Sequence, residues 1–380
     1  MHVAQLELTD FRSWPHAHVA FETGPNLFIG PNGHGKTNLV EALVYLSSLR
    51  SHRVSSDAPL VRAGSEQAVI RTEIFHDARR LRADLAIIPG RSNQAKLNGT
   101  KLGRPRELLG ALRAVAFTPE DLSLVRGEPS VRRRYLDEAL TARQPRMAAV
   151  RSDYDRVLKQ RNTLLRTSYL ARKTSAAGPG SAEMSTLDAW DAHLATLGGD
   201  LMAARLSVID DLVEPMAKSH ADIADGRGDL TLDYRSSLAE KAGALPRDKG
   251  ELTEMLHEAL GAARKDDLDR GTTTVGPHRD DMDLTLGGLP VKGYASHGET
   301  WSVALAMRLG LFELLAGDGV APILILDDVF AELDERRRLR LAEYALGAPQ
   351  TLITCAVASD VPPGLDGPRF TVLEGSVERA

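Results

Sequence analysis

The sequence predicts an α/β fold interrupted by a helical insertion, on three observations. Asn26–Ile29 is a short apolar run that enters a glycine-rich loop, and Thr37–Leu49 continues from that loop with apolar residues at helical spacing. Far downstream, Ile323–Leu326 is a run of four aliphatic residues, which suits a strand of a parallel sheet buried on both faces. Between these segments lies a long, proline-poor stretch with apolar residues three and four apart.

The loop GPNGHGKT at Gly30–Thr37 fits the pattern G-x-x-x-x-G-K-[ST] of a phosphate-binding P-loop. Its glycines let backbone N–H groups close around phosphate oxygens, and the N-terminus of the following helix adds a partial positive charge. We expect Lys36 to reach the β- and γ-phosphates of ATP, and the Thr37 hydroxyl to hold Mg²⁺. The predicted nucleotide contacts in and beside the loop are Gly30, Pro31, Asn32, Gly33, His34, Gly35, Lys36, Thr37 and Asn38.

Two carboxylates, Asp327 and Asp328, follow the aliphatic run. They lie at the carboxyl end of the predicted strand, which is where α/β sheets place their ligands. Asp327 is the expected Mg²⁺ partner, acting through the water shell of the ion, and Asp328 is expected to polarise an attacking water. An aspartate pair alone would indicate no more than a helix cap or a strand end. Its combination with the P-loop predicts Lys36 and Asp328 as the catalytic residues.

A second anion site is predicted at the start of a later helix. Ser296-x-Gly298 precedes a helix-spaced run that extends to Leu315. A serine and a glycine at a helix N-terminus offer hydrogen bonds and a favourable dipole to an anion, although the same pattern alone would be an ordinary cap. Its position between the P-loop and the aspartate pair favours a composite site. Ser296 and Gly298 would then contact the γ-phosphate of ATP held by the P-loop of another subunit.

Composition sets further limits. The chain has 380 residues, 43% of them hydrophobic, which is enough for two domains or for one domain with a large insertion. No stretch approaches 18 uncharged apolar residues and the N-terminus carries early charge, so we expect neither a membrane span nor a secretory signal. The single cysteine, Cys355, excludes an intrachain disulfide and fits a reducing cytoplasm.

Charge is unevenly distributed along the sequence. The net charge of −5 does not by itself indicate a nucleic-acid-binding protein. Residues 51–113 nevertheless hold twelve Lys and Arg against six Asp and Glu, and residues 131–173 hold twelve against four. Either segment alone is more simply a solvated surface. Together they suggest two modest basic surfaces that ATP-driven closure could join into one DNA site, with Arg151 and Arg156 as exposed members.

The remaining elements follow in chain order. Residues 68–88 indicate two strands joined by a polar turn, and Asn98-Gly99 signals a hairpin. Ala114–Leu122 indicates a strand that runs into a helix start at Thr118. After the helical insertion, Leu230–Ser237 suggests a strand and residues 249–264 suggest a helix.

The insertion is predicted to form an antiparallel helical hairpin. Its first limb would cover residues 131–171, its second limb would run from Leu187 to Pro215, and Thr174–Glu183 would form a flexible tip. The predicted domains are therefore a discontinuous ATPase head at residues 1–122 and 271–380, and a helical arm at residues 123–270.

Seven segments of the sequence are informative together: DFRSW (Asp10–Trp14), GPNGHGKTNLVEAL, SHR (Ser51–Arg53), FTPEDLSLVRGEPSVRRRYLD (Phe117–Asp137), TVGPHRDD, YASHGE and LDDVFAELD. The order of their motifs is that of ABC-class ATPase heads of the SMC type, and through these segments the sequence resembles the RecF family of bacterial recombination mediators more closely. The fold class that the resemblance implies is an ABC-type, SMC-like P-loop ATPase head with an inserted helical arm. In DFRSW, Arg12 is expected to contact the nucleotide.

The resemblance implies an ATP-dependent homodimer that binds DNA at gaps or at junctions of single and double strands. It also implies that RecR and RecO act with it in loading RecA during DNA repair, replication restart and the SOS response. Some positions depart from the pattern. Glu299 stands where glutamine is common, and its role is left open. Thr354 stands where transporters carry a histidine, which favours a slow, DNA-stimulated switch ATPase. Glu120 and Asp121 are weak candidates for the Q-loop position.

Three other interpretations compete with that of a RecF-like, DNA-binding ATPase. The first is an SMC-like switch ATPase that clamps a protein partner without touching DNA, which DNA-stimulated ATP hydrolysis would distinguish. The second is the nucleotide-binding subunit of an ABC transporter, disfavoured by the missing histidine and by the basic helical arm. The third is a P-loop kinase, which would not explain Ser296-x-Gly298.

Overall fold

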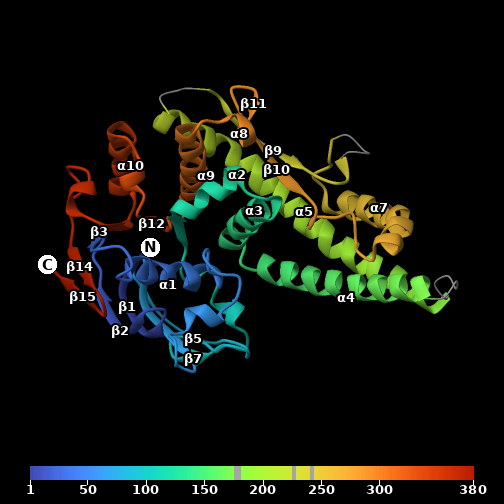
Figure 1. Ribbon diagram of the computed structural model, residues 1–380, viewed down its shortest axis with the longest axis horizontal. Coiled ribbons are helices and arrows are strands. Elements are labelled where there is room, and N and C mark those ends of the chain that lie inside the picture. Colours follow the sequence, from blue (N-terminus) through green and yellow to red (C-terminus); the bar gives the residue numbers. More distant parts are fainter. Residues whose placement is uncertain (175–180, 225–227, 240–243) are drawn as a thin grey trace. The chain divides into compact units, whose positions relative to one another are not determined.

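The computed structural model describes residues 1–174, 181–224, 228–239 and 244–380, without side-chain detail at 171–174 and 181–184. It forms two compact units (Figure 1). Unit 1 comprises Met1–Arg126, Leu212–Leu230 and Leu286–Ala380, and unit 2 comprises Gly127–Asp211 and Thr231–Thr285. The predicted head at 1–122 and 271–380 and arm at 123–270 remain predictions. The main differences are that residues 212–230 group with unit 1 and residues 271–285 with unit 2.

The first sheet of unit 1 has the strand order β2-β1-β4-β5-β6-β7, with antiparallel neighbours throughout. The predicted polar turn joins β4 to β5, and the predicted hairpin joins β6 to β7. At that hairpin Asn98 and Gly99 both have positive φ, 51° and 80°, as a type I′ turn requires. The strands are β1 (His2–Phe11), β2 (Trp14–Ala20), β4 (Ala68–His76), β5 (Arg79–Ile87), β6 (Gln94–Leu97) and β7 (Thr100–Lys101).

The second sheet of unit 1 has the order β15-β14-β3-β13-β12-β8 and is parallel except at β15. In it β13 lies between β3, which enters the P-loop, and β12, which ends at Asp327. The carboxyl ends of these three strands therefore meet. The strands are β3 (Gly24–Ile29), β8 (Ala114–Phe117), β12 (Ile323–Asp327), β13 (Gln350–Cys355), β14 (Arg369–Leu373) and β15 (Ser376–Arg379).

Helix α1 supplies Leu39, Leu43 and Leu46 to a core cluster that also holds residues from strands of both sheets. Helix α9 is long and apolar enough to span a membrane by length and composition, yet 72% of its apolar window is buried in the structure, as in a core helix. The helices of unit 1 are α1 (Lys36–Ser48), α2 (Leu122–Arg126), α8 (Val291–Tyr294), α9 (His297–Gly317) and α10 (Glu335–Gly347). Short 3₁₀ turns are η1 (Ala58–Leu60), η2 (Pro105–Leu108), η3 (Pro119–Asp121), η4 (Phe330–Glu332) and η5 (Ala358–Asp360).

The inserted region is mostly helical, and in it α4 and α5 run in opposite directions (Figure 1). They pack together through Leu165 and Leu187, with Leu268 of α7 beside them. Most of the predicted flexible tip, Thr174–Glu183, lies outside the described residues. The elements are α3 (Pro129–Arg143), α4 (Met147–Thr174), α5 (Ser181–Ala224), β9 (Leu230–Arg235), α7 (Lys249–Arg270) and β10 (Asp281–Leu286), followed by β11 (Leu289–Pro290) in unit 1.

Two predicted helix limits at prolines were wrong, and α7 also continues to Arg270, past its predicted end at residue 264. The first limb is two helices, because Pro145 disfavours helical geometry at Gln144, whose φ and ψ are −133° and 84°. Conversely, Pro215 does not end α5, which continues to Ala224. Met216 beside it is fully buried, and a Cβ at Gly310 of α9 would lie 2.7 Å from the Met216 Cα. This close packing offsets the backbone hydrogen bond that the proline removes.

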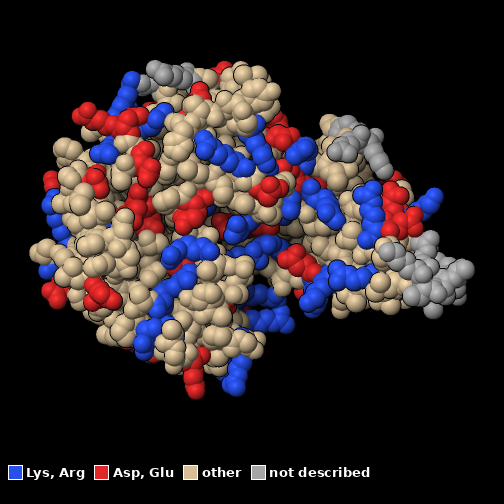
Figure 2. All heavy atoms as spheres, in the orientation of Figure 1, with Lys and Arg blue, Asp and Glu red and all other residues tan. Residues whose placement is uncertain are grey.

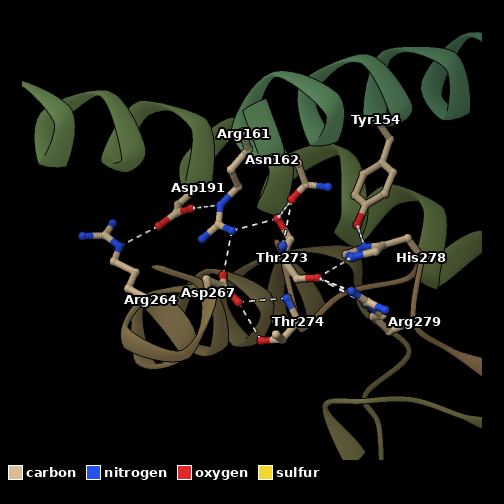
Figure 3. A network of polar contacts seen from close by, with 10 residues as sticks. All are labelled: Tyr154, Arg161, Asn162, Asp191, Arg264, Asp267, Thr273, Thr274, His278 and Arg279. Atoms are coloured by element: carbon tan, nitrogen blue, oxygen red, sulfur yellow. Dashed lines mark hydrogen bonds and ion pairs between the residues drawn. The ribbon is translucent and has the colours of Figure 1, made fainter. Parts of the chain in front are cut away.

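A buried polar network fixes the GPHRDD segment within unit 2 (Figure 3). Arg161 is fully buried and donates to Asp191 at 2.6 Å, to Asp267 at 2.7 Å and to the Thr273 hydroxyl at 2.8 Å. The Tyr154 hydroxyl lies 2.7 Å from His278 Nδ1. A buried guanidinium is tolerated only with such partners, because an unpaired one would lose its hydration without compensation. GPHRDD therefore has a structural role in unit 2.

Candidate nucleotide site

The P-loop follows β3 in a conformation that only glycine permits at two of its fixed positions. A Cβ at Gly30 would lie 2.0 Å from the Val372 carbonyl oxygen of neighbouring β14. Gly35 has φ 98° directly before α1, and its carbonyl accepts a hydrogen bond from the Trp14 indole at 3.1 Å. The loop pattern therefore reflects the close packing of this backbone as well as its expected approach to phosphate.

Lys36 is held beneath the loop with 3% of its side chain exposed. Its ammonium donates to the Gly30 carbonyl at 2.8 Å and to Asn32 Oδ1 at 3.2 Å, and it lies 3.8 Å from a carboxylate oxygen of Asp328. The charge is thus already positioned in the loop. Phosphate oxygens would replace these neutral acceptors with stronger, charged ones.

The structure brings Thr37 and Asp327 together as predicted. The Thr37 hydroxyl donates to Asp327 Oδ1 at 3.1 Å, and the Thr354 hydroxyl donates to the same oxygen at 2.6 Å. Burial is the largest cause that raises the pKa of Asp327 to about 6; the hydrogen bonds from Thr354 and Thr37 act to lower it, and the nearby charges of Asp328 and Glu120 act to raise it. A hydroxyl and a buried carboxylate are hard oxygen donors, so this pair fits Mg²⁺.

Asp328 has its backbone fixed and its carboxylate open to solvent. Its N–H donates to the Thr354 hydroxyl at 2.9 Å, its φ is 52°, and its side chain is 31% exposed. The carboxylate is therefore accessible to a water while its position is set by β13. Thr354 thus connects both aspartates, a role that the sequence interpretation missed when it noted only the missing histidine. The sequence feature that could have revealed this role was the Thr354 hydroxyl directly after the apolar pair Leu352-Ile353, near the carboxyl end of β13.

Glu41 of α1 is a second residue that the sequence interpretation missed. It is fully buried and accepts hydrogen bonds from Arg12 at 2.9 and 2.6 Å, from Ser51 at 2.6 Å and from Arg53 at 3.1 Å. Burial acts to raise the pKa of Glu41, but the hydrogen bonds from Arg12 and Ser51 together with the charges of Arg12 and Arg53 outweigh it, so the pKa is lowered. Glu41 therefore joins DFRSW and SHR to the P-loop helix. The sequence feature that could have revealed Glu41 was a lone carboxylate among the apolar residues of that helix.

Arg12 and Asn38, both predicted nucleotide contacts, are engaged within the protein. The third nitrogen of the Arg12 guanidinium donates to the Pro59 carbonyl at 3.0 Å. Asn38 donates to the Ser13 hydroxyl and accepts from Arg53, each at 2.8 Å. Both residues border the loop, so their contact with nucleotide stays a prediction.

Ser296 caps α9 at an exposed surface. It forms a capping box with Glu299, in which the Ser296 N–H donates to the Glu299 carboxylate at 2.8 Å. Glu299, whose role was left open, therefore stabilises the start of this helix. Gly298 faces α10, because a Cβ there would lie 3.1 Å from Arg337 Nη1. The exposed N-terminus of a 21-residue helix is suited to an anion, and the role of Ser296 and Gly298 toward ATP stays a prediction.

The two weak Q-loop candidates differ clearly in their surroundings. Asp121 is buried, accepts the Thr118 N–H at 2.9 Å, and pairs with Arg308 at 2.6 Å, so it serves as a helix cap. Glu120 is exposed and is close enough to influence Asp327. Glu120 is therefore the better candidate for a group beside the metal site.

Comparison with known proteins agrees with this geometry. The family model described as RecF/RecN/SMC N terminal domain matches residues 2–359. The DNA replication and repair protein RecF of Streptomyces avermitilis is 53% identical over 380 residues, covering 100% of both chains. RecF of Kineococcus radiotolerans is 51% identical over 379 residues, covering 97% of this chain and 96% of its own.

The chain belongs to the RecF family. Solved structures of the recombination mediator protein RecF with ATP and with ATPrS, described as part of the RecFOR pathway, are 29% identical to it. They cover 100% of this chain and 97% and 98% of their own, with TM-scores of 0.89 and 0.87. A Pyrococcus furiosus Smc head is 14% identical, covers 100% of this chain and 96% of its own with a TM-score of 0.54, and shares the fold. The predicted ABC-type α/β fold class is thereby confirmed.

Proposed function

We propose that this RecF-family chain is an ATP-dependent, DNA-binding recombination mediator. It binds ATP with Mg²⁺, dimerises on DNA at gaps or at junctions of single and double strands, and acts with RecR and RecO in loading RecA. It works in DNA repair, replication restart and the SOS response in the cytoplasm. The observation that carries the proposal is the assembled cluster of Lys36, Thr37, Asp327, Asp328 and Thr354 at the ends of three adjacent parallel strands.

In this mechanism each residue has one task. Lys36 neutralises charge on the β- and γ-phosphates, and Thr37 with Asp327 would hold Mg²⁺, which supplies charge stabilisation to the phosphates. Asp328 orients a water and accepts its proton. Ser296 and the N-terminus of α9 from a second copy contact the γ-phosphate, so that the site is complete only in the dimer.

A slow switch is the activity that fits these contacts. The Thr354 hydroxyl is already shared by both aspartates, so it is committed to positioning them. Glu41 links the P-loop helix to the segments that hold Arg12 and Ser51. A change in that helix on nucleotide binding would therefore be transmitted to both segments. The solved RecF structures with ATP, described as members of the RecFOR pathway, support the assignment of nucleotide and partners.

Size-exclusion chromatography with light scattering tests this proposal. We expect a monomer without nucleotide, a dimer with ATP and Mg²⁺, and a larger dimer population when gapped DNA is added. Phosphate release should be slow and should rise with DNA. If ATP drives dimerisation but DNA changes neither the dimer population nor hydrolysis, the alternative is correct and the protein clamps a protein partner without binding DNA.

A further inference from the structure

The first sheet of unit 1 carries a local basic surface at its β6–β7 end. Figure 2 shows basic and acidic side chains interspersed over much of the visible face of the molecule. Residues 85–110 depart from this balance, with five basic residues against one acidic residue, Glu107, a local net charge of +4 in a chain whose net charge is −5. The five basic residues are Arg91, Lys96, Lys101, Arg104 and Arg106.

Strand register places the two lysines on the outer face of the sheet. Ala83, Leu85 and Ala95 are at most 2% exposed and point into the core, so the alternate residues point outward. Lys96 is therefore on the outer face, and Lys101 stands directly opposite it in the β6–β7 register. Both side chains are exposed.

Along the same face toward β1, each arginine has its own carboxylate. Arg71 pairs with Glu7 at 2.8 Å, and Arg80 pairs with Glu73 at 2.5 Å. The next arginine, Arg82, lies 3.5 Å from Asp84. The balance of charge thus holds across β1, β4 and β5.

At β6 and β7 this balance ends. Neither Lys96 nor Lys101 forms an ion pair with any residue that the structure describes. Asp84 stands opposite Lys96 in register but already lies near Arg82, so three cations share one carboxylate on this part of the face. Like charges directly across strands disfavour the folded state slightly, and a bound polyanion would remove that cost.

The turns at this end add further positive charge. Arg91, in the turn between β5 and β6, and Arg104, after β7, are both exposed and make no ion pair within the described ranges. The one acidic residue, Glu107, accepts the Gly103 N–H at 3.3 Å. We call Arg91, Lys96, Lys101 and Arg104 the basic edge.

A lysine on an edge strand is more simply explained as protection, because its charge discourages the edge from pairing with a strand of another molecule. It accounts for Lys101, because β7 is the last strand of the sheet. It does not account for Lys96, which lies on an inner strand, or for the arginines in the turns. Four exposed cations that have no acidic partner in the part of the chain that the structure describes instead fit a row of phosphates.

We propose that the basic edge binds the phosphate backbone of DNA. This inference rests on the proposed function and names the surface through which the chain would contact its nucleic acid. Cationic side chains at a sheet edge reach phosphates without reading base edges, so the contact is independent of sequence. Each phosphate neutralised adds about 0.9 to the magnitude of the slope of log K against log salt.

The test is a salt titration of fluorescent duplex DNA binding by the full chain. We compare wild type, Lys96→Glu/Lys101→Glu, and the control Lys218→Glu/Lys265→Glu, whose lysines are exposed elsewhere and carry the same charge change. The edge variant should show a slope smaller in magnitude by about 2, as expected for two lost phosphate contacts, while the control keeps the wild-type slope. Monomer ATP affinity should be equal in all three proteins.

Each other outcome is informative. If the edge variant keeps the wild-type slope while wild type binds DNA, the basic edge is not a DNA surface. If the edge variant keeps that slope but loses ATP-dependent self-association, the edge contacts an acidic surface of a second copy, and the DNA assignment is wrong. If wild type shows no DNA binding at low salt with ATP, the proposed function itself fails.

Discussion

Replacing Asp328 by asparagine should separate ATP binding from hydrolysis. The backbone at this position has φ 52°, a left-handed conformation that asparagine tolerates and that alanine adopts only with strain of about 1 kcal/mol. Its N–H bond to Thr354 is made by the main chain and survives the substitution. Asp328→Asn therefore removes the negative charge and the proton-accepting oxygen without disturbing the fold.

The magnitude follows from the role assigned to the carboxylate. A positioned general base contributes about 10²–10⁴-fold to rate, or roughly 3–5 kcal/mol of barrier. Hydrolysis should fall by that factor. Nucleotide affinity should be kept or increased, because the mutation also removes the negative charge of Asp328. That charge lies 3.8 Å from Lys36, and it acts to raise the pKa of Asp327.

Phosphate release at saturating ATP and light scattering of the eluted protein measure the two effects. Glu332→Gln is the matched control, since it neutralises an exposed carboxylate four residues away. We expect the control to behave as wild type and Asp328→Asn to accumulate as an ATP-bound dimer. Hydrolysis within about twofold of wild type would show that Asp328 is not the base. A variant that stays monomeric with saturating ATP would refute the composite site.

Three further predictions follow from other parts of the structure. Lys36→Arg should keep the fold and lower hydrolysis at least about tenfold, because loop oxygens at 2.8 and 3.2 Å leave no room for a planar guanidinium; wild-type phosphate release would contradict this. Ser296→Arg should leave ATP binding to the monomer intact and block dimerisation, whereas Ser296→Ala, which loses the same cap, should still dimerise by light scattering. Burial lowers the pKa of His278 to about 4, with Arg279, Arg133 and Arg161 adding to the effect, so folded-state stability should be lost as pH falls from about 6.5 toward 4, by at most about 3 kcal/mol. Urea unfolding at pH 7 and pH 5 should show this loss in wild type and in the exposed-site control His193→Gln, and a smaller loss in His278→Gln.

The residues that meet in the candidate nucleotide site could be located from sequence because their expected chemistry is encoded in short contiguous motifs. GPNGHGKT and the aspartate pair each carry their own strand, and the carboxyl ends of parallel strands meet at one edge of a sheet. That rule placed Thr37 and Asp327 on one expected Mg²⁺ ion, although they are 290 positions apart in the chain; their direct hydrogen bond was not predicted. The hairpin at Asn98-Gly99 was predictable for a similar local reason, since few residues adopt positive φ twice in succession.

The parts that could not be predicted depend on contacts between distant segments. Glu41 is conspicuous only once Arg12, Ser51 and Arg53 are seen to converge on it. Arg151, expected to be an exposed DNA-binding residue of the arm, instead pairs with Asp137 at 2.8 Å and is 22% exposed. Arg156 is exposed but pairs with Asp153. Counts of charged residues showed an excess of Lys and Arg in residues 51–113 and 131–173, but they could not show which of these cations already had acidic partners.

The basic edge gives the ATP-dependent DNA site a quantitative test. One subunit offers four cations at this edge that pair with no carboxylate among the described residues, and a dimer offers eight. With about 0.9 per contact, the slope of log K against log salt has a magnitude of about 3.6 for one edge and about 7.2 for two. A fourfold rise in salt would then weaken binding about 150-fold in the first case and about 20,000-fold in the second. Titrations with and without ATP should therefore differ in slope as well as in affinity. Equal slopes, with tighter binding in ATP, would mean that only one edge contacts DNA at a time and that closure does not join the two surfaces.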